Sequence, residues 1–195
     1  MTRHFRAVYA CCAVLLLTTL CVACQRAGAS APAGASRIER GKYLVTLGGC
    51  HDCHTPMKLG QSGPELDMAH MLSGHPQDLA MPPAPPLQAP WGWAGAVTNT
   101  AFAGPWGVSY AANLTPDEES GLGVWTDEMF IKAMRTGRSM GAGRPILPPM
   151  PWHALGQATD EDLAAILAYL RTIPPVRNVV PKPQIAAPPA AAATS

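Results

Sequence analysis

The chain has few charged residues and no excess of either sign. Charged side chains make up 14% of its 195 residues, and the formal net charge is +1. Proteins that bind nucleic acid usually present a basic patch or stripe, and this composition supplies none. We therefore expect no nucleic-acid partner, and the length predicts a single modest domain.

Cysteine is nearly absent after residue 24. Four of the six cysteines lie in the first segment, MTRHFRAVYACCAVLLLTTLCVAC, where two arginines precede an apolar run. That layout is typical of a secretory signal. The run is a little short for a membrane span of about 20 residues. We therefore predict a cleaved signal peptide over residues 1–23 and a periplasmic protein, rather than a retained anchor.

Two processing sites compete after the apolar run. The tripeptide VAC, which ends at Cys24, resembles the lipobox of bacterial lipoproteins, although Cys21 stands where that family usually has leucine. Lipidation of Cys24 would attach the protein to a membrane, with residues 24–35 as a flexible linker. The AGA tripeptide at residues 27–29 would instead release a soluble protein. Of the two, we favour the lipoprotein.

The two remaining cysteines belong to one short motif, Cys-His-Asp-Cys-His, at residues 50–54. C-x-x-C-H is the attachment signature of a c-type haem. Residues three and four apart share one face of a helix, so the sulfurs of Cys50 and Cys53 can form thioethers with the haem vinyl groups. His54 would be the proximal iron ligand, with its other ring nitrogen held by an acceptor such as a backbone carbonyl.

The sequence offers little to the other uses of a Cys-x-x-Cys pair. A disulfide across two intervening residues closes a tiny loop and adds little stability. A thioredoxin-like redox pair would lie near a βαβ pattern, and none is apparent. A zinc site needs a second pair of ligands, which the remaining histidines do not form; we expect ordinary polar roles for them: His51, His70, His75 and His153.

The sixth iron ligand decides what a haem protein does, and methionine is the residue to search for. Eight methionines follow the motif, at positions Met57, Met68, Met71, Met81, Met129, Met134, Met140 and Met150. Met150 lies in RPILPPMPWHAL, where prolines forbid helix and hold the chain extended. A stiff loop can present one sulfur at a fixed point, so Met150 is the first candidate. Met140, in the loop SMGAG, is the reserve.

Three helices are predicted from capping and periodicity. The first covers residues 36–47, where Ser36 and Glu39 form a capping box. The second covers residues 127–136, between a threonine cap and a glycine stop. The third covers residues 160–173, with three acidic residues in its first turn and a proline after its end. No strand-rich region is apparent, although residues 91–112 have room for short hairpins.

Several segments together resemble class I c-type cytochromes, in particular the bacterial mono-haem domains that accompany periplasmic dehydrogenases. The matching segments are RGKYLVTLGGCHDCHTP, LSGHP, NLTPDEESGLGVWTDEMFIKAMRTG and PPMPW with the helix after it. The resemblance spans about residues 36–177. It implies an all-α cytochrome c fold with a third helix and one covalently bound haem, in which the N- and C-terminal helices cross at Gly41 and Tyr169 and Met150 is the distal ligand.

Within this cytochrome c domain of residues 36–177, residues 57–112 would be a long, loop-rich insertion. The proline- and alanine-rich residues 178–195 after the domain would be a disordered tail. Asn113 and Arg144 are candidates to reach the haem propionates, because a buried carboxylate needs a donor or a positive charge.

These expectations lead to an electron-transfer protein rather than an enzyme. A haem held by His54 and Met150 would carry single electrons between periplasmic redox partners, such as a dehydrogenase and an oxidase or another cytochrome. One alternative is a haem enzyme or gas sensor with an open or displaceable distal site. Another is a fixed cytochrome subunit of a dehydrogenase complex, which shares the chemistry and differs only in its partners.

Overall fold

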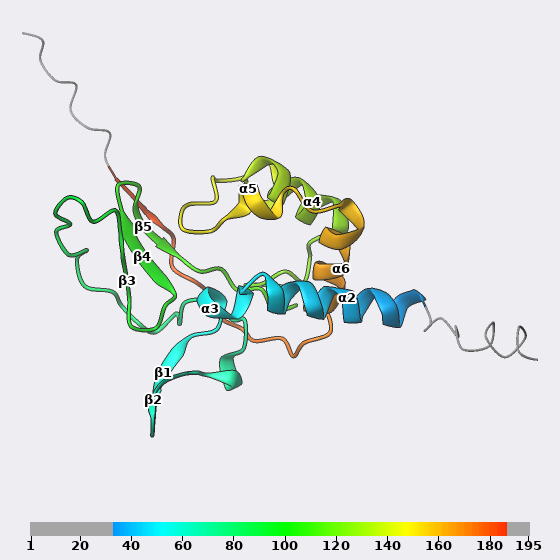
Figure 1. The fold of residues 1–195 in the computed structure, drawn as a ribbon, viewed down its shortest axis with the longest axis horizontal. Helices are drawn as coiled ribbons and strands as arrows, with labels where there is room; N and C mark the ends of the chain where they lie inside the picture. Colours follow the sequence, from blue (N-terminus) through cyan, green and yellow to red (C-terminus); the bar gives the residue numbers. More distant parts are fainter. Residues whose placement is uncertain (1–32, 187–195) are drawn as a thin grey trace, which may run out of the picture. The chain divides into compact units, whose positions relative to one another are not determined.

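The computed structural model describes residues 33–186, with side chains from Ser36 onwards (Figure 1). The chain divides into two compact units at Ser36, and the second unit, Arg37–Ser195, contains almost all of the described residues. The predicted signal peptide, Cys24 and residues 187–195 lie outside them. Within the described part, no helix has both the length and the apolar character needed to cross a bilayer.

Five α-helices occur in the described residues, and the three longest are those that the sequence predicts. In chain order they are α2 (Ala33–Leu47), α3 (Cys50–His54), α4 (Asp127–Thr136), α5 (Trp152–Leu155) and α6 (Asp160–Leu170). The caps of α4 and α6 are as predicted, since Thr126 and Thr159 each accept a backbone N–H through their side chains. Helix α2 begins three residues before its predicted start, so Ser36 lies inside the helix rather than at its cap.

Helices α2 and α6 touch at Gly41. A Cβ atom at this position would overlap the carbonyl oxygen of Ala165 and lie 2.9 Å from Cβ of Tyr169. The close approach to Tyr169, which the resemblance implied, is therefore confirmed. Beside the contact, Arg40 forms an ion pair with Asp162 at 2.8 Å.

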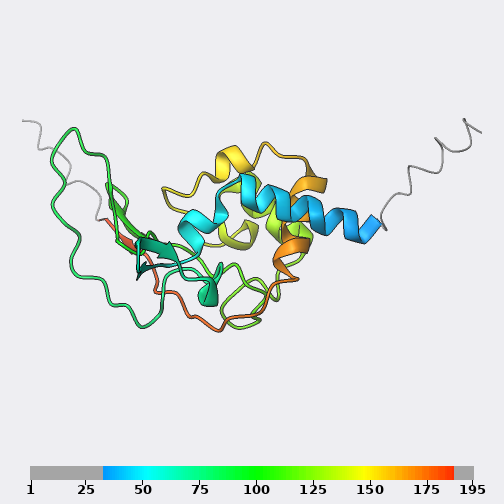
Figure 2. The same ribbon diagram turned by 60° about the horizontal axis from the view of Figure 1, so that its bottom comes forward.

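The predicted insertion contains most of the strands. A two-stranded hairpin of β1 (Met57–Gly60) and β2 (Gly63–Leu66) comes first. The second sheet is antiparallel in the order β3-β4-β5-β6, with strands β3 (Ala94–Gly95), β4 (Ala101–Gly104), β5 (Gly107–Tyr110) and β6 (Gln184–Ile185). The structure thus adds a β component to the all-α fold that the sequence predicted, while the long open connection before β3 remains a loop (Figure 2).

Residues 178–186, which were expected to belong to a disordered tail, are ordered. Strand β6 lies in the C-terminal segment, drawn in red in Figure 1, and pairs with β5. Asn178 is only 6% exposed. Backbone pairing and the buried amide of Asn178 hold this segment. Neither requires apolar residues at regular spacing, which is the pattern that usually predicts an ordered segment from sequence.

The main hydrophobic core lies between α2, α4 and α6. Its buried members are Val45, Leu72, Leu122, Phe130, Ala133, Met134, Leu163, Ile166, Leu167, Leu170 and Ile173. Partly buried side chains pack against this cluster, among them Cys50, Met150, Trp152 and Leu155. The core therefore brings the cysteine motif and the proline-rich methionine loop to one cluster of apolar residues.

Candidate haem site

The Cys-x-x-Cys-His motif forms a single helical turn, α3. Gly49 directly precedes this turn in the left-handed conformation, with φ of 63°. Cys50 and Cys53 are half-buried and free of disulfide bonds. Burial raises the pKa of Cys50 to about 11 and also raises that of Cys53. A reactive redox pair needs a cysteine with a lowered pKa, so these thiols do not fit the thioredoxin-like alternative.

His54 is buried and held in one tautomer. Its Nδ1 lies 2.8 Å from the carbonyl oxygen of Ala112. A carbonyl only accepts, so Nδ1 carries the hydrogen and donates it, which leaves the lone pair of the neutral ring on Nε2. Burial lowers the pKa of His54 and favours this neutral form. A neutral imidazole whose Nδ1–H is bonded to a carbonyl is the donor arrangement of a metal-ligating histidine, and the residues present fit a haem iron.

Two chain segments far apart in the sequence support that hydrogen bond. Residues 72–75 and 111–114 run antiparallel, and we call this pairing the proximal ladder. Its backbone hydrogen bonds run from Leu114 N to Leu72 O at 2.8 Å and from His75 N to Ala111 O at 3.0 Å. Gly74 N also donates to the carbonyl oxygen of His54 at 2.8 Å. The ladder thus holds the backbone of His54 on one side and its side-chain acceptor on the other.

Gly74 makes the close approach within the ladder possible. Its φ is 80°, and a Cβ atom here would lie 2.6 Å from both the carbonyl carbon and the carbonyl oxygen of Ala112. In the sequence, the segment LSGHP contributes only to the resemblance. A glycine directly before a histidine was the available signal for this support, whereas nothing local marks Ala112 as the acceptor.

The structure treats the two candidate methionine ligands differently. Met150 is partly buried and packs on the same core cluster as Cys50. Met140 is 43% exposed and has a positive φ of 53°. The backbone before Met150 is also fixed, because Ser109 Oγ donates to the carbonyl oxygen of Pro148 at 2.5 Å. These positions favour Met150 over Met140, and its role as a ligand stays a prediction.

The other histidines of the described chain have non-ligand contacts. Nδ1 of His51 lies 3.0 Å from Thr55 Oγ1, so this half-buried ring has a polar partner within the protein. His75 is fully buried with contacts at both ring nitrogens, to Thr100 Oγ1 at 2.9 Å and to the carbonyl oxygen of Leu79 at 3.0 Å. Within residues 33–186, no three His, Cys, Asp or Glu side chains gather as a metal site.

The contacts of Asn113 do not favour its predicted role as a propionate donor. Its amide nitrogen donates to the carbonyl oxygen of Val176 at 2.8 Å and to Ser120 Oγ at 3.1 Å. Its amide oxygen accepts from the backbone and hydroxyl of Thr115. Both halves of the amide are therefore engaged within the protein. Arg144 is exposed and donates to the carbonyl oxygen of the next residue, Pro145.

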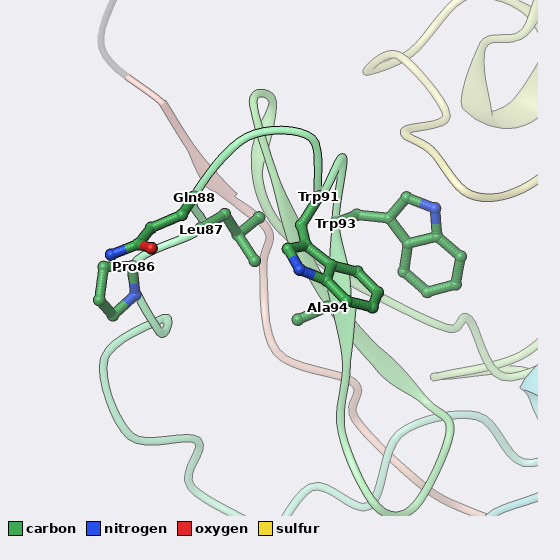
Figure 3. Close-up of a pocket in the computed structure, with 6 residues that line it drawn as sticks. All are labelled: Pro86, Leu87, Gln88, Trp91, Trp93 and Ala94. Atoms are coloured by element: carbon green, nitrogen blue, oxygen red, sulfur yellow. The ribbon is translucent and has the colours of Figure 1, made fainter.

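A separate surface pocket lies on the insertion. It has a volume of about 430 Å³ and is lined by Pro86, Leu87, Gln88, Trp91, Trp93 and Ala94 (Figure 3). Trp91 is 76% exposed. The lining includes neither the cysteine motif nor Met150, so this pocket is distinct from the candidate haem site.

Comparisons with known proteins find cytochrome-containing relatives. No protein-family model matches the chain. It is 33% identical over 158 residues to the fructose dehydrogenase cytochrome subunit of Gluconobacter japonicus, covering 79% of this chain and 25% of the relative. It is 31% identical over 133 residues to the cytochrome c subunit of the alcohol dehydrogenase (quinone) of Gluconobacter oxydans, covering 68% and 20%. Over 132 residues it is 28% identical to the gluconate 2-dehydrogenase cytochrome c subunit of Pantoea cypripedii, covering 68% and 22%.

The chain therefore spans a quarter or less of the length of these three relatives. All three are named as cytochrome subunits of dehydrogenases. The similarity covers more than two thirds of this chain in each case. It supports a cytochrome c domain as the common part.

Proposed function

We propose that this chain is a c-type cytochrome that binds one haem covalently and carries single electrons, with a dehydrogenase as one of its redox partners. The observation that carries the proposal is the buried His54, which follows two free cysteines on one helical turn and donates from Nδ1 to Ala112 O at 2.8 Å. The similarity to dehydrogenase cytochrome subunits supports the choice of partner.

Each residue of the site has a defined task in this proposal. A bound haem supplies a reversible one-electron change at its iron. Cys50 and Cys53 hold the cofactor through thioether sulfurs, and His54 presents Nε2 to the metal. Met150 provides a soft sulfur ligand from a fixed loop. The apolar cluster against which Cys50 and Met150 pack excludes water and disfavours extra charge, which raises the reduction potential.

The number of haems follows from the motif count. The sequence contains one C-x-x-C-H motif, at residues 50–54, so we propose a single haem. We also propose export to the periplasm by the signal at residues 1–23 and lipidation at Cys24. Mass spectrometry of the mature, exported protein tests all three statements, since it reports the N-terminal residue, any acyl chain and the mass of attached haem.

Optical spectra test electron transfer against the rival haem enzyme or gas sensor. The oxidised and reduced wild type should be low-spin and should not bind carbon monoxide, because both axial positions are filled. Met150→Ala should gain carbon monoxide binding. Met140→Ala is the matched control, because it removes the other loop methionine at an exposed position, and it should behave as the wild type does. A wild type that binds carbon monoxide would establish the open-site alternative.

The fixed-subunit alternative is supported by the names of the relatives, which are subunits. It predicts that the native, untagged protein purifies from its source with a dehydrogenase subunit at a constant ratio. A mobile carrier would purify alone and still accept electrons from the dehydrogenase when the two are mixed. Size-exclusion chromatography of the native extract, followed through the haem absorbance, separates these outcomes.

A further inference from the structure

One side chain of the C-terminal segment, that of Asn178, makes several hydrogen bonds to the backbone of a distant part of the chain. Its amide nitrogen donates to the carbonyl oxygens of Ser73 at 2.7 Å and His75 at 2.9 Å. Its amide oxygen accepts from the backbone N–H of Gln77 at 2.8 Å. One buried amide thus binds three backbone groups of residues 73–77. The first two of these groups belong to the residues on either side of Gly74 in the proximal ladder.

The backbone around Asn178 also holds the other half of the ladder region. The carbonyl oxygen of Val176 accepts from Asn113 Nδ2 at 2.8 Å. The backbone N–H of Asn178 donates to Ser120 Oγ at 3.0 Å, and Asn113 Nδ2 bonds the same hydroxyl at 3.1 Å. Residues 176–178 therefore bridge residues 73–77 to the segment that begins at residue 113. Asn113 directly follows the acceptor of the His54 hydrogen bond.

These contacts converge on His54 without touching it. In the proximal ladder, Gly74 N binds the carbonyl oxygen of His54, and Ala112 O accepts from its ring. The distance between Nδ1 and Ala112 O depends on how residues 72–75 sit against residues 111–114. Asn178 is positioned to fix that relation, because its amide binds the two residues that flank Gly74.

We propose that Asn178 is a positioning residue for the proximal histidine: it keeps Ala112 O within hydrogen-bond distance of Nδ1 of His54 and so tunes the imidazole as a ligand. The inference rests on the proposed function, in which His54 binds the haem iron. A bonded Nδ1–H makes the imidazole a stronger donor to the metal. A stronger donor stabilises the ferric state, so loss of this support raises the reduction potential.

The test compares Asn178→Ala with Val108→Ala in the full-length, haem-loaded protein. Val108 is a buried residue of β5 outside residues 72–77, 111–114 and 176–178, so its truncation controls for loss of stability alone. Proton NMR measures the exchange rate of the Nδ1 hydrogen of His54, and redox titration measures the midpoint potential. We expect exchange at least tenfold faster in Asn178→Ala than in Val108→Ala, together with a higher potential that Val108→Ala does not share.

The outcomes separate this inference from the proposed function. If the wild type carries haem and Asn178→Ala matches Val108→Ala in both exchange and potential, Asn178 is merely structural and the inference fails alone. A wild type without haem would overturn the proposed function and the inference together. If Asn178→Ala does not fold, Asn178→Ser takes its place, because a serine hydroxyl can bond at most one of the two carbonyls. It should show the same changes in smaller measure, and their absence would equally refute the inference.

Discussion

Replacing Gly41 by alanine tests the close contact between α2 and α6. The sign of the change in stability shows whether the contact exists. Gly41 lies within α2, where alanine is intrinsically favoured over glycine by about 1 kcal/mol. If nothing packed against this position, Gly41→Ala would stabilise the protein. In the structure, the new methyl group would overlap the carbonyl group of Ala165 and lie 2.9 Å from Cβ of Tyr169. Backbone atoms of α6 cannot rotate away, so the helices must separate.

The expected magnitude is the difference between these two effects. Overpacking a tight contact costs about 1–3 kcal/mol, and the upper end applies because the overlapped atoms belong to the backbone. Helix propensity offsets about 1 kcal/mol of this cost. The free energy of unfolding should therefore fall by about 2 kcal/mol. In a domain of this size each kcal/mol lowers the melting temperature by about 2–4 °C. We therefore expect Gly41→Ala to melt about 4–8 °C below the wild type.

Thermal unfolding of the haem-loaded protein, followed by circular dichroism, makes the measurement. Gly92→Ala is the control, because a Cβ atom at Gly92 meets nothing within 4 Å. It reports the general effect of removing a glycine from the unfolded chain, which is neutral or slightly stabilising. A Gly41→Ala variant that is as stable as Gly92→Ala, or more stable than the wild type, would refute the close contact between α2 and α6.

Two further substitutions test the ladder and a surface ion-pair cluster. Gly74→Ala should be at least about 1 kcal/mol less stable than Gly63→Ala and should have haem attached in a smaller fraction of its molecules. Both glycines have a positive φ, but of the two only Gly74 has backbone atoms against it. Equal stability and equal haem content in the two variants would contradict this. Partial burial alone would raise the pKa of Asp127, but hydrogen bonds from Arg37 and Arg171 outweigh it and hold that pKa below its usual 3.8. The stabilisation is therefore present above about pH 4 and is lost as pH falls through the lowered pKa. Asp127→Asn should be about 1 kcal/mol less stable at pH 7, and urea titrations should show the difference shrinking below pH 4.

The predictable parts of this fold are those whose signals are local. A threonine before an acidic turn and a glycine after the last turn located α4, and the cap of α6 was equally clear. The five residues of α3 form a contiguous C-x-x-C-H motif. The residues proposed to attach the haem could therefore be predicted from the sequence without knowledge of the fold. The described strands gave no such signal, because none exceeds four residues and two of them, β3 and β4, consist largely of alanine and glycine.

The support of the site could not be predicted because it is non-local. His54 and Ala112 are 58 positions apart, and Asn178 lies 105 positions from Ser73. Nothing in the sequence around either acceptor shows that a distant donor will reach it. The order of residues 178–186 is non-local in the same way. It depends on hydrogen bonds to distant residues, among them those of Asn178 and those of the two-residue strand β6, whereas the composition is that of a disordered segment.

The insertion is better understood as scaffold for both faces of the proposed haem site. It begins shortly after His54 and ends at Ala112, the acceptor of the His54 ring, so the proximal ladder closes it at the ligand itself. Just before this acceptor, Ser109 on β5 binds the carbonyl oxygen of Pro148, which lies close to Met150 in the chain. Strand β5 thus leads directly from the loop of the candidate distal ligand to the acceptor of the proximal one.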